Sequence, residues 1–204
     1  MNTNRRTAAR RRHLQRGVAA LEAALLMPVA IFLLLGSFET YQYFRADAIV
    51  ARASFAVANG VAMQPKLIGG SCKQSDSVCT YSTIAQDLFT PLNYEAHGGL
   101  IISGFKTDVG SGSNPKAEWD DDPWSCSYKG SKGAAGPESR IADTEDFPPP
   151  RAGDTLIVAE VFYEYEPYIM SSKFWSSLGG TKMLYSRFFF RPRFEELGAK
   201  PPCH

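Results

Sequence analysis

The chain has 204 residues, which is enough for one domain with a hydrophobic core and an additional anchor or tail. Its formal net charge of +1 conceals an asymmetry, because the first 17 residues hold six arginines and no acid, whereas the remainder carries 16 basic against 21 acidic side chains. A basic arm on an acidic protein is typical of binding to nucleic acid or to an anionic membrane. The arm adjoins an apolar run and lacks the interleaved aromatic side chains of a nucleic-acid surface. We therefore expect a membrane as the partner and no nucleic acid.

Residues 18–38 form the apolar run, which contains one charged side chain, Glu22. At about 1.5 Å per residue, a helix of this length matches a hydrocarbon core of about 30 Å. Because the arginines precede the run, the positive-inside rule predicts a cytoplasmic N-terminus and an extracytoplasmic remainder. A cleaved secretory signal is the alternative, but its apolar segment is usually about 7–15 residues long and precedes a small-residue cleavage site, which is not found here. We predict a transmembrane segment over residues 18–38.

Glu22 has two explanations. Near the N-terminal end of a helix, a carboxylate complements the partial positive charge of unpaired backbone N–H groups, and this needs no function. The second explanation applies if the chain is cut after Gly17. The new α-amino group of Val18 would then be a cation in or near lipid, and the Glu22 carboxylate would neutralise it.

The stretch from residue 11 to 44, RRHLQRGVAALEAALLMPVAIFLLLGSFETYQYF, resembles TadE/TadF-type minor pseudopilins of the tight-adherence (Flp, type IVb) pilus system. The family pattern is a basic leader, Gly-x-x-x-x-Glu, a leucine-rich segment with an early proline, then a glycine and an acidic-aromatic patch. The matching positions are Gly17, Glu22, Pro28, Gly36 and Glu39, whereas Ala23 stands where related sequences often carry an aromatic residue. Residues 153–169 and 185–194 are similar to the late strand and the closing segment of the same family.

The resemblance implies a pilus function. Residues 1–17 would be a leader that a prepilin-type peptidase removes between Gly17 and Val18, and residues 18–38 would hold the protein in the bacterial inner membrane. The C-terminal domain would lie in the periplasm or outside the cell, with other pilins or pseudopilins and the tight-adherence assembly platform as partners. Glu22 would be an assembly residue. The resemblance implies no cofactor and no small-molecule substrate.

Residues 39–64 continue the helix with an amphipathic pattern and no proline before Pro65. We predict one helix from about Ala19 to Met63, with a kink or a melted turn at Pro28, where a backbone donor is missing. Its apolar face is predicted from residues that recur at spacings of three and four, namely Phe44, Ala48, Val50, Ala51, Phe55, Ala58 and Ala62.

Residues 65–204 are predicted to form an extracytoplasmic α+β domain. A short helix is expected over residues 82–89, capped by Ser82 or Thr83. Strands are expected over residues 99–109, about 124–128, 156–166 and 183–190, the last ended by Pro192. The strand at 156–166 reads as half-buried, with Glu160, Glu164 and Glu166 on an exposed charged face. The predicted architecture is pilin-like: a long transmembrane and amphipathic helix packed on a small antiparallel sheet.

Four cysteines lie beyond the apolar run, which predicts two disulfides in an exported domain. Three pairings are possible, and we favour Cys72 with Cys79 and Cys126 with Cys203. A metal site is the weaker reading, because no C-x-x-C spacing occurs and the three histidines are scattered. The acidic run WDDDPW at residues 119–124 reads as a solvated turn between two packing tryptophans rather than a calcium site.

No serine, cysteine or histidine arrangement resembles a nucleophile with its base, so we expect no enzymatic activity. The leading function is a minor pseudopilin that is processed after Gly17 and takes part in pilus assembly. The alternative is an uncleaved, membrane-anchored binding or scaffold protein of the same apparatus. An anchored enzyme is a third class that no group of residues supports.

Overall fold

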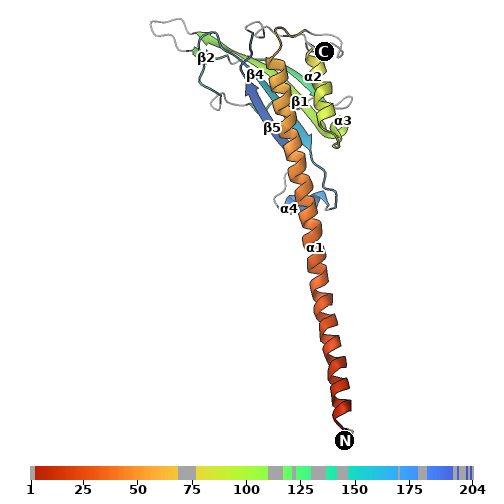
Figure 1. The fold of residues 1–204 in the computed structure, drawn as a ribbon. Helices are drawn as coiled ribbons and strands as arrows, with labels where there is room; N and C mark the ends of the chain where they lie inside the picture. Colours follow the sequence, from red (N-terminus) through yellow and green to blue (C-terminus); the bar gives the residue numbers. More distant parts are fainter. Residues whose placement is uncertain are drawn as a thin grey trace.

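The computed structural model describes residues 3–68, 77–109, 117–120, 123–129, 137–141, 147–169, 171–178, 183–194, 197, 201 and 203. The architecture is α+β, as predicted. One long helix, α1 (Thr3–Ala62), lies with its C-terminal part on an antiparallel β-sheet, and its N-terminal part projects far beyond the sheet (Figure 1).

Helix α1 spans 60 residues, which corresponds to about 90 Å at the rise of an α-helix. It begins well before Ala19, because the alanine- and arginine-rich N-terminal residues favour helix. It ends at Ala62, shortly before Pro65, as expected. The α-helix continues through Pro28, so the melted turn that we considered there is not present. A kink at this proline stays a prediction.

The face of α1 that packs on the sheet agrees with the predicted one in part. Val50, Ala58 and Ala62 are buried as predicted, whereas Phe44, Ala48 and Phe55 are exposed and Ala51 is half-buried. The buried face consists of small side chains, and it also includes Ala46, Ala53, Val57 and Val61, which were not predicted. Small side chains let a helix lie close to a sheet, whereas a phenylalanine at the centre of the contact would hold the two apart. Phe55 accordingly lies beside the sheet and contacts the rings of Phe188 and Phe190 edge-on.

The sheet has five antiparallel strands: β1 (Gly98–Val109), β2 (Ala117–Trp119), β3 (Trp124–Lys129), β4 (Thr155–Glu164) and β5 (Met183–Phe190). β4 lies between β1 and β5, and the predicted pairing of β4 with β5 is confirmed. β2, which was not predicted, and β3 follow one another along the other edge of β1. The two tryptophans that flank the acidic run, Trp119 and Trp124, are buried as predicted, whereas residues 121–122 lie outside the described residues and the solvated turn predicted there stays a prediction.

The sheet is covered on both faces, which corrects the prediction for β4. On one face Ile157, Ala159 and Val161 belong to the core beneath α1. On the other face Leu156 and Val158 form a second cluster with Phe105, Trp119 and Phe147. All of β4 from Leu156 to Tyr163 is buried, Glu160 included, so the strand is central rather than half-exposed. Segments 137–141 and 147–150 supply this second cover, and no periodicity within β4 reveals it.

Three short helices complete the fold. α2 (Val78–Leu88) begins four residues before the predicted Ser82, because Val78 and Tyr81 are buried against α1. The Tyr81 hydroxyl donates a hydrogen bond of 3.0 Å to the Gly60 carbonyl of α1. α3 (Tyr94–His97) leads into β1, and α4 (Ser172–Ser177) lies between β4 and β5 in the sequence.

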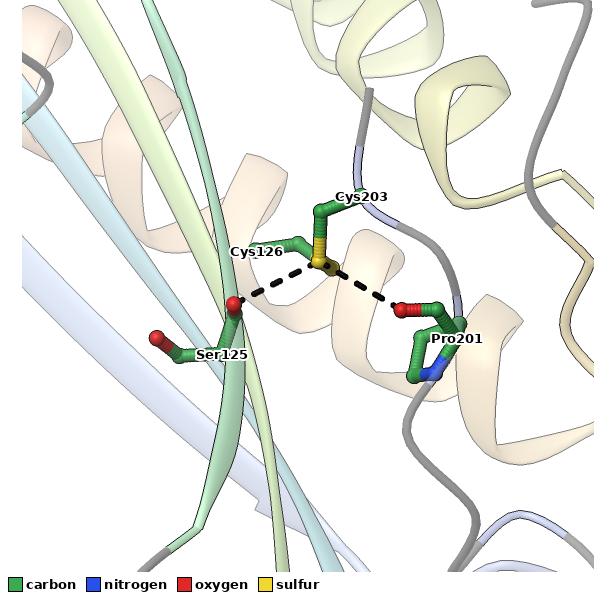
Figure 2. The surroundings of a disulfide bond; sticks show 4 residues. All are labelled: Ser125, Cys126, Pro201 and Cys203. Carbon is green, nitrogen blue, oxygen red and sulfur yellow. Dashed lines mark hydrogen bonds between the residues drawn. A yellow bond between two sulfur atoms is a disulfide. The ribbon is translucent and has the colours of Figure 1, made fainter.

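The C-terminal tail is fastened to the sheet by the predicted disulfide between Cys126 of β3 and Cys203, which are 77 residues apart (Figure 2). The Cys203 sulfur also lies 3.4 Å from the Ser125 carbonyl oxygen and 3.6 Å from that of Pro201. These are contacts rather than hydrogen bonds, since a disulfide sulfur carries no proton. Cys79 is disulfide-bonded as well, whereas Cys72, its predicted partner, lies outside the described residues.

Candidate functional site

The N-terminal part of α1 is apolar and projects from the domain, which it contacts at Phe32. It belongs to a helix that is long and apolar enough to cross a membrane, and none of its most apolar 18-residue window is buried within the chain. Its large exposed side chains are Leu21, Leu25, Leu26, Met27, Val29, Ile31, Phe32, Leu33, Leu34, Leu35 and Phe38. A surface of this size in contact with water is very unfavourable, so it requires lipid or other apolar helices around it.

The site residues expected from the sequence lie along this helix. Gly17, Val18, Glu22 and Pro28 all fall within α1, and Glu22 is exposed. They are neighbours along one helix, in the N-terminal part that projects from the domain (Figure 1). The isolated chain therefore presents Glu22 to its surroundings rather than to a partner in its own domain.

Glu39 lies at the junction between the exposed helix and the domain, and its side chain is fully buried (0% exposed). Its carboxylate accepts a hydrogen bond of 2.6 Å from the Tyr165 hydroxyl, beyond the end of β4. It also accepts bonds from the backbone N–H groups of Tyr168 (3.1 Å) and Ile169 (2.9 Å). Buried carboxylates require such donors, because an unpaired charge away from water is costly. Glu39 thus binds α1 to the segment that follows β4.

Aromatic rings enclose this junction. One turn beyond Glu39, the Tyr43 ring packs edge-on against Tyr165, with 5.3 Å between ring centroids, and at the same distance from Trp175 of α4. Burial, and then the hydrogen bond to the Glu39 carboxylate, raise the pKa of the Tyr165 hydroxyl. The hydroxyl therefore remains protonated and donates to Glu39 throughout the physiological range of pH.

The importance of Glu39 was only partly visible in the sequence. It matched the family pattern and followed the apolar run, but its partners are 126 to 130 residues away. In the strand predicted over residues 156–166, alternation puts Tyr165 on the face opposite the three glutamates, and a buried tyrosine hydroxyl usually finds a polar partner. The need of the Tyr165 hydroxyl for a polar partner was the signal in the sequence that could have pointed to Glu39.

Glu160 is a second buried carboxylate, which contradicts the exposed charged face predicted for β4. It is 0% exposed and accepts hydrogen bonds from the Ser139 hydroxyl (2.6 Å), the Arg140 backbone N–H (2.9 Å) and the Tyr185 hydroxyl (2.8 Å). The Arg140 guanidinium lies over the rings of Phe162 and Tyr185, 5.8 and 5.2 Å from their centroids. Glu160 therefore holds the segment around residue 140 on the second face of the sheet.

The other acids of that strand behave differently. Glu164 and Glu166 are exposed, and Glu166 lies 3.7 Å from the His97 ring nitrogen. Among the residues that the structure describes, no group of three or more His, Cys, Asp or Glu side chains is placed to hold a metal ion. Each of the two buried carboxylates accepts hydrogen bonds from residues of other segments, so the geometry assigns them to fastening segments together.

Comparison with known proteins gives one match. The family model described as TadE-like protein matches residues 17–59, about a fifth of the chain, from Gly17 to the part of α1 that packs on the sheet. No curated protein and no solved structure matches the chain. The matched segment contains Gly17, Glu22, Pro28 and Glu39. Residues 17–59 are therefore a TadE-like segment, which confirms the family resemblance found in the sequence.

Proposed function

We propose that the protein is a minor pseudopilin of a tight-adherence (Flp, type IVb) pilus. In this proposal a prepilin-type peptidase cuts between Gly17 and Val18, and α1 holds the product in the bacterial inner membrane. The sheet domain then lies on the extracytoplasmic side, where it meets other pilins or pseudopilins and the assembly platform. The TadE-like match supports the association with this pilus system.

The observation that carries the proposal is the form of α1. Its apolar N-terminal part projects from the domain with all of its large side chains exposed, while its C-terminal part is locked onto the sheet and into the Glu39 junction. Such a helix has two uses in one molecule: it anchors the domain in lipid, and it offers a surface that packs with equivalent helices. Both uses suit a subunit that waits in a membrane before it is assembled.

Cleavage would change the electrostatics of that surface. Before processing, α1 carries arginines ahead of Gly17, and these favour the cytoplasmic side. After processing, the helix would begin with the α-amino cation of Val18, one turn from Glu22. A Glu22 carboxylate that meets the Val18 amine of a neighbouring subunit would satisfy both charges and fix the axial register of the two helices.

The alternative is an uncleaved, membrane-anchored scaffold or binding protein of the same apparatus. It uses the same exposed helix and the same domain, and it differs in the mature N-terminus. Neither version assigns the protein a catalytic activity, a cofactor or a small-molecule substrate.

Intact-mass measurement of the protein from cells that contain the cognate prepilin peptidase tests the proposal. The expected product lacks residues 1–17 and begins at Val18. Gly17→Val should abolish this product, whereas Ala19→Ile, an equal gain in bulk two residues further on, should leave cleavage in place. A full-length protein would reject processing in favour of the uncleaved anchor. A cut beyond Phe38 would instead identify a secretory signal and reject both versions.

A further inference from the structure

Part of the domain lies beside the membrane-length stretch of α1. The Phe174 ring of α4 meets the Phe32 ring of α1 edge-on, with 6.3 Å between centroids. Phe32 is six residues closer to the N-terminus than Phe38, where the apolar run ends. In Figure 1, α4 lies apart from the sheet, displaced along α1 toward its N-terminus. The domain therefore overlaps the anchor instead of stopping at its end.

The length of the helix decides what this overlap means. Only 14 residues separate Val18 from Phe32, about 21 Å of helix. A hydrocarbon core of about 30 Å needs the whole stretch from Val18 to Phe38. If the hydrocarbon core ended at Phe32, the apolar helix inside it would be about 9 Å shorter than the core is thick. The bilayer that α1 spans must therefore reach the level of α4.

The side chains at that level suit such a position. We define the base segment as residues 167–169 and 171–178, which run from the end of β4 through α4. Its large apolar side chains are turned outward: Tyr168, Ile169, Phe174 and Leu178 are 58%, 44%, 41% and 59% exposed. Lys173 is exposed between them. Exposed aromatic and aliphatic side chains with a lysine whose stem can reach toward the headgroups are the composition of an interfacial membrane element.

The base segment is also held in place from within. Trp175 of α4 is buried against Tyr43 and Tyr165. Glu39 binds the backbone of Tyr168 and Ile169 at the other end of the segment. The apolar side chains consequently face outward from a fixed support, and their exposure does not result from a loose loop.

We propose that the base segment inserts into the extracytoplasmic leaflet of the same bilayer that holds α1. A depth of about 9 Å below Phe38 agrees with the 5–10 Å at which interfacial helices lie. The domain would then have two attachments to the membrane, one spanning and one interfacial, and these would fix its tilt and rotation. This inference rests on the membrane anchoring of the proposed function and is independent of the cut after Gly17.

Lipid is the occupant of the base segment's outer surface, because the length of the apolar part of α1 places lipid at the level of α4 whether or not another subunit is present. A neighbouring pilin helix is the rival occupant. A neighbouring helix would cover the same side chains only after assembly. It would also not explain why the apolar part of α1 between Val18 and Phe32 is too short to span the bilayer.

Photocrosslinking in vesicles tests the inference. The full chain, carrying Leu178→p-benzoylphenylalanine, is reconstituted into vesicles of phosphatidylethanolamine and phosphatidylglycerol, irradiated and analysed by peptide mass. The same replacement at Leu34, which is exposed within the span, is the control for anchoring, and the replacement at Ile84, an exposed residue of α2, is the control for the outer domain. Lipid adducts are expected at positions 178 and 34 and not at 84.

The outcomes separate this inference from the proposed function. An adduct at Leu34 without one at Leu178 would overturn insertion of the base segment and leave the anchor intact. A crosslink from Leu178 to another copy of the chain, without lipid, would overturn it in favour of a subunit contact. Loss of the lipid adduct at Leu34 as well would reject the membrane anchor itself, and the inference with it.

Discussion

At the scale of single residues, two buried glutamates have similar roles, Glu39 at the junction of α1 with the domain and Glu160 within β4. Glu39 collects three donors from the chain that follows β4, and Glu160 collects three from the segment around residue 140 and from β5. A carboxylate suits both places because it only accepts hydrogen bonds, whereas an amide or a hydroxyl would also bring donors that need partners. Each acid therefore converts a loop with free N–H and O–H groups into a fastened segment.

Replacing Glu39 should loosen the junction. Glu39→Ala leaves the Tyr165 hydroxyl and two backbone N–H groups without their acceptor, and we expect it to lower the free energy of unfolding by about 3 kcal/mol. Glu39→Gln should cost less, although its NH₂ group would face one of these donors. Urea unfolding of the full chain in detergent measures both. Glu164→Ala, an exposed acid of β4, is the control and should change stability by less than about 0.5 kcal/mol. Equal effects of Glu39→Ala and Glu164→Ala would contradict the role of the junction.

Glu160 and Tyr185 predict a dependence on alkaline pH. Burial, followed by the hydrogen bond to Glu160, raises the pKa of the Tyr185 hydroxyl in the folded protein. Tyrosine in an unfolded chain ionises near pH 10, so the stabilisation is complete below that pH and is lost as the pH rises above it. We expect the stability advantage of the wild type over Tyr185→Phe to be about 2 kcal/mol at pH 8 and to shrink by at most about 1.4 kcal/mol per unit above pH 10. Urea unfolding at pH 8 and pH 11 checks this, and an undiminished difference at pH 11 would count against it.

At the scale of elements, the local patterns predicted where helices and strands occur better than which faces they bury. The type and the C-terminal end of α1, and the strands β1, β4 and β5, followed from apolar periodicity and from the positions of Pro65 and Pro192. The packed face of α1 followed only in part, because the pattern gave weight to large apolar residues such as Phe44. The close approach to β4 and β5 selects Ala46 and Ala53 instead. Size matters here as much as hydrophobicity.

The wrong predictions in the sheet domain have a common origin: residues distant in the sequence bury or pair with the segments concerned. Glu160 looked exposed because the residues that bury it come from a separate segment 20 residues earlier in the chain. β2 has three residues, too few for a period to be seen, and it exists through its pairing with Thr107–Val109. α2 begins early because α1 buries Val78 and Tyr81. Each of these features depends on a partner that no local window contains.

The disulfide between β3 and the C-terminal tail gives a prediction at this scale. Cys203 is exposed, so Cys203→Ala removes the crosslink without opening a cavity. Opening a loop of 77 residues should lower the free energy of unfolding by about 4 kcal/mol in the chain-entropy account. Adding Cys126→Ala then reports the packing of the buried partner alone. Unfolding by urea, with peptide mapping under non-reducing conditions to establish the pairing, provides the measurement. A loss below about 0.5 kcal/mol would show that the tail is not held by this bond.

At the scale of the whole molecule, the protein is a rigid support on a long apolar helix. The relative positions of Gly17, Glu22 and Pro28 could be predicted from the sequence because the three residues lie on one continuous helix, where separation along the chain fixes distance in space. Their roles stay predictions. The Glu39 junction could not be completed in that way, since it joins the end of the apolar run to residues after β4. The fold thereby connects the exposed apolar part of α1 to the sheet through one acid and three aromatic rings.

Glu22 is the one charged side chain in the apolar run of residues 18–38, and it is exposed. Two physical accounts of this residue predict different effects of its replacement. A carboxylate that complements the helix dipole contributes about 0.3–1 kcal/mol and acts within its own chain. A carboxylate that pairs with the Val18 amine of a neighbouring subunit leaves that amine buried and unpaired when it is removed, which typically costs about 3–5 kcal/mol.

Assembly of pili therefore distinguishes these accounts. If Glu22 pairs with a neighbour, Glu22→Ala and Glu22→Gln should both abolish pilus formation and co-purification with other pilus components, because glutamine keeps the shape of the side chain and loses its charge. Processing after Gly17 and insertion into the membrane should persist in both variants, since the peptidase site is intact and the span becomes more apolar. Intact mass and membrane fractionation establish those two steps before assembly is scored. Glu164→Gln, which removes a charge from the exposed end of β4, should assemble normally and serves as the matched control. Normal pili from both Glu22 variants would restrict Glu22 to its own helix.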